Sequence, residues 1–345
     1  MSEAAIKDKD YFLDKNATTL LRAVAIVFMI VHHMVGFPDW VSAENARFVW
    51  SLNGHNIEWE FAMFCKLCIG IYAFITGYAA YINREKYCSI RYCFKKIMTF
   101  LLSYWVVYAL FLLYGVIAHE PLPSLGGLVQ NLFGFHTDID NEWICVVFAW
   151  YVRFHIFTVA SLCFWFRLRY CADTRKRVVM AAEALAVLLC LCVLSTRLGL
   201  VHELIKRLAR KIVETSPMVI SGLICARFTI FEKIKKSEQR LNINGIVSLC
   251  IYAAILLLLL PVRKQLRLPV KYLSCDMFIT PIFAYCLISI VNELKGRVPV
   301  GLRKRLWPVT SALAAHSMNI WFIHGIFSHR IRRRNGWRIC RITEC

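Results

Sequence analysis

The stretch LLRAVAIVFMIVHHMVGF, residues 20–37, decides how this chain folds. Its length and apolar character are those of a helix that crosses a bilayer, yet it carries Arg22, His32 and His33. Ionisable side chains are costly inside a membrane and are usually retained there for a function. The stretch therefore predicts a membrane-spanning helix that also contributes to a site.

Arg22 and His33 fall on one face of this predicted helix. They are eleven residues apart, so at about 100° per residue His33 returns to within about 20° of Arg22. The two lie roughly 16 Å apart along the axis, about half the hydrocarbon thickness. His32 points about 100° away and is the poorer candidate. The alternatives are an arginine that snorkels to the interface and a histidine that hydrogen-bonds a neighbouring helix.

The rest of the chain has the same apolar character. Of its 345 residues 59% are apolar, and the mean hydropathy is +0.54. The fold class that we predict is all-α, a polytopic integral membrane helical bundle of about nine to ten transmembrane helices. Nine spans are expected, at about 20–37, 59–82, 97–117, 143–166, 178–196, 216–231, 245–262, 273–292 and 310–327.

Three regions are expected on this basis. Residues 1–18 form a short cytoplasmic lead, residues 19–327 form the transmembrane domain, and residues 328–345 form a basic tail. The tail stands where a tenth span would be expected, so we interpret it as an altered or shortened end. Residues 201–214 have the period of a separate amphipathic basic helix at the membrane interface.

The formal charge of +20 comes mainly from short loops between apolar segments. This is typical of cytoplasmic loops and anionic lipid headgroups, so we expect membrane lipid as a partner and no nucleic acid. The basic segment 83–96 predicts a cytoplasmic loop and the acidic segment 118–142 an external one. The protein is thus expected in the cell membrane as a multi-pass chain with a cytoplasmic N-terminus. Strict alternation of the spans would place the basic loops 197–215 and 263–272 outside, which conflicts with the positive-inside rule. The topology prediction therefore covers only the first half of the chain.

Five elements resemble the acyltransferase-3 family of integral membrane acyltransferases, and they occur in the family's order over almost the whole chain. They are Arg22 with His33, FITGYAAY at 74–81, AWYVRF at 149–154, SPMVISGLICARF at 216–228 and HSMNIWFIHGIF at 316–327. Two features depart from the family pattern. Thr76 replaces the serine of its F-x-x-S-G-Y element, and Thr99 stands where a second arginine of a basic pair is common.

The resemblance implies transfer of an acyl group, usually acetyl, from cytoplasmic acyl-CoA to a hydroxyl of a cell-surface glycan or glycolipid. Acyl-CoA would be a donor substrate, and no permanently bound cofactor is expected. Such a reaction needs a general base, and histidine is the usual one near neutral pH. We predict that His33 deprotonates the acceptor or takes part in a covalent relay. Arg22 would hold the CoA phosphates or polarise the thioester carbonyl.

Other residues of the matched elements are secondary candidates, each with an ordinary structural alternative. The CoA-binding candidates are Arg91, Lys95 and Lys96, which the positive-inside rule explains equally well. The substrate-binding candidates, which helix packing or interfacial aromatic positions also explain, are Thr76, Tyr78, Trp150, Tyr151, Ser317 and His324.

No metal site is expected. Cys65 and Cys68 form one C-x-x-C inside a span without a second pair, and the acidic loop 136–142 has the composition of a solvated loop. Lys66, in the same span, requires a partner or a polar cavity. Two other functions stay open: a transporter or flippase for a lipid-linked sugar, and a non-catalytic membrane scaffold. Protein partners cannot be inferred from the sequence.

Overall fold

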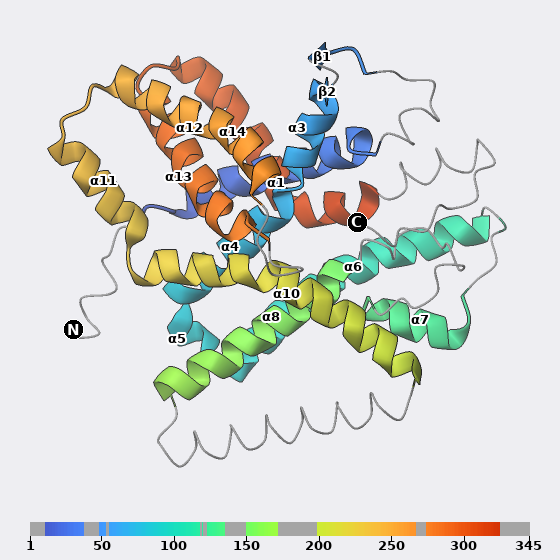
Figure 1. Ribbon diagram of the computed structural model, residues 1–345. Coiled ribbons are helices and arrows are strands. Elements are labelled where there is room, and N and C mark those ends of the chain that lie inside the picture. Colours follow the sequence, from blue (N-terminus) through green and yellow to red (C-terminus); the bar gives the residue numbers. More distant parts are fainter. Residues whose placement is uncertain are drawn as a thin grey trace.

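The computed structural model in Figure 1 describes residues 11–37, 48–52, 55–117, 119, 123–134, 150–171, 199–266 and 274–324. Within these ranges the chain is helical apart from short connections and one antiparallel hairpin, β1 (Ser51–Leu52) with β2 (His55–Asn56). The predicted all-α class is confirmed. The span at 178–196, the acidic loop at 136–142, the lead at 1–10 and the tail at 328–345 lie outside the described residues.

The helices of the described residues follow in chain order. They are α1 (Lys15–Val35), α3 (Ile57–Cys65), α4 (Cys68–Ile82), α5 (Arg84–Tyr87), α6 (Ile90–Ile117), α7 (Leu125–Leu132), α8 (Trp150–Phe166), η3 (Arg167–Cys171), α10 (Gly199–Arg227), α11 (Ile230–Arg240), α12 (Gly245–Gln265), α13 (Asp276–Leu294) and α14 (Val300–Ala315). A last described helix spans 317–324.

Five helical segments among the described residues are long and apolar enough to cross a membrane. They are α1, α3 with α4, α6, α12 and α13. Apolar side chains on the outside of α6 support this assignment, because Leu102, Val106, Leu110 and Leu113 are all exposed and a lipid bilayer would cover them. The total of nine to ten spans stays a prediction.

α1 is a single helix through both of its ionisable positions. It begins at Asp14, whose carboxylate accepts a hydrogen bond from the Ala17 N–H at 2.7 Å, an N-terminal cap of the kind that aspartate favours. It continues to Val35, so the helical arithmetic between Arg22 and His33 holds. Leu21, Ala25, Ile26 and Met29 are buried against the neighbouring helices.

Among the candidate spans, the segment of α3 and α4 is the most enclosed, and α4 packs against α1, α10 and α13. Its contact with α10 is made backbone to backbone at two glycines. A Cβ on Gly77 would lie 1.9 Å from the Val219 carbonyl oxygen, and one on Gly222 would lie 2.1 Å from the Phe74 carbonyl oxygen. Small residues allow such close approach in membrane bundles, where packing replaces the hydrophobic effect between helices.

Several predicted boundaries are wrong. The ninth span, expected at about 310–327 after a loop, is instead α14, which begins at Val300 and ends at Ala315, followed by the separate helix at 317–324. The amphipathic segment at 201–214 and the span at 216–231 form one continuous helix, α10, with Pro217 inside it. The chain then reverses at Thr229, whose φ of 49° is left-handed, and enters α11. The change of composition at residue 215 therefore marks no break in the backbone, and the helix ends where a single residue adopts the left-handed conformation.

Candidate active site

α1 brings Arg22 and His33 to the same side of the bundle as the sequence predicts. The Nδ1 of His33 lies 2.9 Å from the Met29 carbonyl oxygen. A carbonyl only accepts, so Nδ1 carries the proton and Nε2 is the basic nitrogen of the neutral ring. One turn of the helix thus sets the tautomer that a general base requires.

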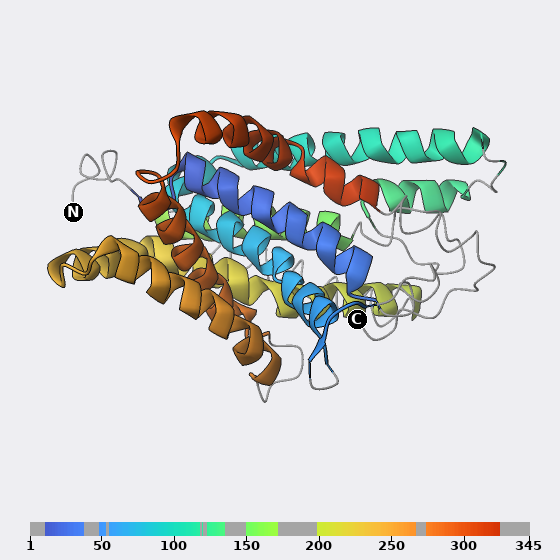
Figure 2. The same cartoon turned by 90° about the horizontal axis from the view of Figure 1, so that it is seen from above.

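The helix at 317–324 brings the late serine–histidine element to the same place. The ring centroid of His324 lies 4.4 Å from that of His33, and the Nδ1 of His324 hydrogen-bonds the Trp321 carbonyl. In Figure 2 this helix lies between α1 and α6, and Phe322 makes its contact with α6 through Tyr104, at a ring separation of 5.1 Å. Two histidines that are far apart in sequence therefore form one pair.

Tyr72 of α4 links this histidine pair to Arg22. Its hydroxyl donates to the backbone carbonyl oxygen of Arg22 at 3.3 Å and lies near the Ser317 hydroxyl. Its ring meets the Trp321 ring edge to face at 5.7 Å. The result is a path from the Arg22 backbone through the side chains of Tyr72, Ser317 and Trp321 to His324, which we call the inner column.

α8 completes the inner column on its other side. The ring of Tyr151 lies 5.4 Å from that of Trp321 and 6.4 Å from that of Tyr72. Its hydroxyl lies near that of Thr76, which donates to the Tyr72 carbonyl at 2.8 Å. Tyr151 is buried at 3% exposure. Thr76, Tyr151, Ser317 and His324 therefore join Arg22 and His33 in one site.

Lys96 lies at the Arg22 end of the inner column. It is half-buried in the second turn of α6, and its ammonium group is close enough to the Arg22 guanidinium for the two charges to interact. Two cations held near each other favour an anionic ligand between them. His155 of α8 also lies near Lys96 and stacks on Phe100 with ring centroids 4.1 Å apart.

Four candidates lie away from the inner column. Arg91 and Lys95 are exposed on the outer side of α6. Tyr78 donates to Glu232 of α11 at 3.2 Å and stacks on Phe231. Trp150 lies beside Tyr151 at the start of α8, and its ring faces the Lys211 ammonium at 5.1 Å. Their roles in binding stay predictions.

A break between α3 and α4 adjoins the histidine pair. The backbone makes tight i to i+3 bonds there, from Lys66 to Met63 and from Leu67 to Phe64, so the normal helical partner of the Ala62 carbonyl is lost. The Nδ1 of His32 lies 2.9 Å from the Ala62 carbonyl oxygen and replaces the missing backbone N–H as its hydrogen-bond partner. His32 thus joins α1 to α3, as its orientation away from Arg22 suggests.

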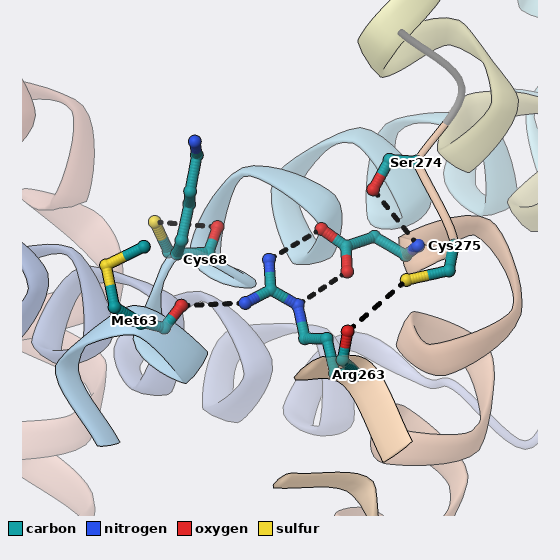
Figure 3. A network of polar contacts seen from close by, with 7 residues as sticks. Met63, Cys68, Arg263, Ser274 and Cys275 are labelled. Atoms are coloured by element: carbon teal, nitrogen blue, oxygen red, sulfur yellow. Dashed lines mark hydrogen bonds and ion pairs between the residues drawn. The ribbon is translucent and has the colours of Figure 1, made fainter. Parts of the chain in front are cut away.

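An ion pair supports the same break from the opposite side. Figure 3 shows the guanidinium of Arg263, from α12, beside the Met63 carbonyl. The other partner of this guanidinium is Asp276, the first residue of α13. Arg263 donates to Met63 at 2.7 Å and to the two Asp276 carboxylate oxygens at 2.6 and 2.9 Å. Three helices are thereby joined at one point. Lys66 lies in the break, within electrostatic range of both His32 and His33.

Sequence reasoning missed three members of the site: Tyr72, Trp321 and His155. Each has a helical spacing that could have revealed it. Tyr72 precedes Thr76 by four residues, Trp321 follows Ser317 by four, and His155 follows Tyr151 by four, and residues four apart share a helix face.

The column offers a base and cations but no set of metal ligands. Among the described residues no group of three or more His, Cys, Asp or Glu side chains is placed to hold a metal ion. A histidine pair next to hydroxyls, with two cations at the far end, suits proton abstraction beside an anionic substrate.

Comparison with known proteins gives the family. A model of the acyltransferase domain, acyltransferase family 3, matches residues 11–334. No curated protein and no solved structure gives a significant match. The matched region contains all the residues of the inner column, together with the apolar helices of a membrane protein. The chain therefore belongs to the acyltransferase-3 family and is a membrane acyltransferase.

Proposed function

We propose that this protein transfers an acyl group, acetyl by preference, from cytoplasmic acyl-CoA to a hydroxyl of a cell-surface glycan or glycolipid. The observation that carries the proposal is the inner column, which runs from a histidine pair at one end to the Arg22 backbone at the other, where Lys96 lies within electrostatic range of the Arg22 guanidinium. The protein would act as a multi-pass protein of the cell membrane with its N-terminus in the cytoplasm.

His33 is the general base in this proposal. Its Nε2 takes the proton of the acceptor hydroxyl while the oxygen forms a bond to the thioester carbonyl carbon. The carbon–sulfur bond then breaks, and the proton passes from His33 to the departing CoA sulfur. His324, at 4.4 Å between ring centroids, lies near enough to position the acceptor hydroxyl or the His33 ring.

Arg22 and Lys96 receive the donor at the other end of the column. The phosphates of CoA are strongly anionic, and Arg and Lys bind phosphate through charge-assisted hydrogen bonds. The distance of roughly 16 Å along α1 between Arg22 and His33 leaves room for the extended pantetheine arm. Arg91 and Lys95 would attract the donor from the membrane surface, because both are exposed on the neighbouring turns of α6.

Transfer of label from radioactive acetyl-CoA tests the proposal directly. Membranes containing the full chain are compared with His33→Ala, Arg22→Ala and the control His316→Ala, whose side chain is exposed just outside the column. Loss of a general base lowers rates by about 10²–10⁴, so His33→Ala should lose transfer while His316→Ala retains it. Full transfer by His33→Ala would refute the assignment of the base.

A transporter or flippase of a lipid-linked sugar is the second candidate, and one observation favours it. The break between α3 and α4 resembles the discontinuous helices that line transporter sites, and Lys66 lies in it. Movement of a fluorescent lipid-linked sugar across proteoliposomes, without incorporation of label from acetyl-CoA, would support this function instead. Absence of both activities would favour a non-catalytic scaffold.

A further inference from the structure

A cavity of about 750 Å³ lies away from the inner column, between α8, η3 and the C-terminal half of α10. This size is within the range of about 300–1,000 Å³ that is typical of small-molecule sites. In Figure 1 the ends of α8 and α10 that border it lie on the same side of the bundle as α5. The inner column does not use this cavity.

The walls of the cavity are mainly apolar along its length. They include Phe157, Leu162 and Trp165 from α8 and Ile220, Leu223 and Ile224 from α10. Several of these side chains are exposed to the surroundings of the bundle, among them Trp165 at 55% and Ile220 at 50%. In a membrane protein such a surface contacts hydrocarbon, so the cavity can accept an acyl chain from the bilayer.

One end of the cavity is basic. Arg169 of η3 and Arg227 at the end of α10 both line it, together with the phenol groups of Tyr81 and Tyr170. No Asp or Glu lines the cavity, and among the described residues neither arginine forms an ion pair with a carboxylate. An anionic group is therefore the complementary ligand for this end.

The guanidinium of Arg227 lies 5.2 Å from the centroid of the Phe228 ring, and two other arginines that also contact the protein add to the positive charge there. Arg84 donates to the Tyr81 carbonyl at 3.2 Å, and its guanidinium lies over the Tyr81 ring. Arg167 donates to the Cys88 carbonyl at 3.1 Å. Basic pockets between helices on the cytoplasmic side of a membrane are the sites where anionic headgroups bind, and the basic segment 83–96 predicts that side here.

We propose that this cavity binds one anionic glycerophospholipid, with its phosphate between Arg169 and Arg227 and an acyl chain between α8 and α10. A neutral or zwitterionic lipid would fit the apolar walls but not the two cations. The site is separate from the proposed acyl transfer and does not depend on it.

Quenching of tryptophan fluorescence by brominated lipids can test this site, because Trp165 lines the cavity. The full chain in detergent micelles is titrated with phosphatidylglycerol that carries brominated acyl chains, and separately with brominated phosphatidylcholine. Each basic residue near a membrane surface strengthens the attraction of an anionic lipid about five-fold. We therefore expect an apparent preference for phosphatidylglycerol of about 30-fold, and Trp165→Phe should remove the saturable part of the quenching.

The variants R169Q/R227Q and R240Q/R303Q make a matched pair, because Arg240 and Arg303 are exposed arginines on α11 and α14, away from the cavity. The first should lower the preference about 30-fold and each of its single variants about five-fold, whereas the second should leave it unchanged. Equal quenching by both lipids, equal effects of the two double variants, or full quenching of Trp165→Phe would overturn the proposal. Displacement of the lipid by millimolar inorganic phosphate would show a soluble anion site instead.

Discussion

Replacement of Asp276 by Asn tests the ion pair that holds the break between α3 and α4. The Arg263 side chain is 15% exposed and that of Asp276 9%, and Arg263 also binds the Met63 carbonyl. The substitution leaves a buried guanidinium without its counter-charge. Removal of one partner from a buried pair costs about 3–5 kcal/mol, so we expect Asp276→Asn to lower the free energy of unfolding by that amount.

Unfolding in mixed micelles of rising dodecyl sulfate content measures this loss. Lys264→Met is the matched control. Lys264 follows Arg263 directly in α12 and forms an ion pair with Glu60 of α3, but the Lys264 side chain is 54% exposed. A surface pair contributes about 0–1 kcal/mol, so the control should lose less than about 1 kcal/mol. The contrast separates burial from the mere presence of an ion pair.

The double variant R263M/D276L removes both charges together. Because neither buried charge is then left alone, its loss of stability should be smaller than that of Asp276→Asn. The reasoning is refuted if Asp276→Asn is as stable as Lys264→Met. It is equally refuted if the double variant loses at least as much as the single one.

Three further substitutions follow from the described contacts. Gly77→Val should abolish monodisperse protein on size exclusion, since its Cβ would lie 1.9 Å from a carbonyl oxygen, whereas Gly126→Val, with its nearest atom at 4.0 Å, should be tolerated. Tyr72→Phe should lower the rate of acetyl transfer, while the free energy of unfolding should fall by only about 1 kcal/mol, the typical contribution of one hydrogen bond. Lys96→Met should raise KM for acetyl-CoA more than Lys95→Met, because only Lys96 lies near Arg22.

The part of the site that local helical geometry determines could be predicted from the sequence. Arg22 and His33 share a face of α1 because the helix runs unbroken from Lys15 to Val35. Ser317 and His324 likewise share a face of their helix, and their predicted closeness to the site agrees with the ring contact between His324 and His33. In a regular helix the turn and the rise per residue are fixed, so the spacing of two residues in the sequence determines their relative positions in space.

The features that depend on contacts between distant segments could not be predicted. Neither Lys66 nor Leu67 is a helix breaker, and the break is stabilised by donors from elsewhere, His32 and Arg263. By local preference Pro217 would end or kink a helix, but it lies inside α10. In both cases tertiary partners override local preference, and such partners leave no periodic signal along the chain.

The close approach of α4 and α10 at Gly77 and Gly222 restricts how this protein can change by mutation. A side chain added at either position meets a backbone carbonyl oxygen of the opposite helix. This oxygen is present whichever amino acid occupies the facing position. No exchange of a neighbouring side chain can make room for it, in contrast to a crowded position in an ordinary core. A search for second-site suppressors of Gly77→Val should therefore find none within α10.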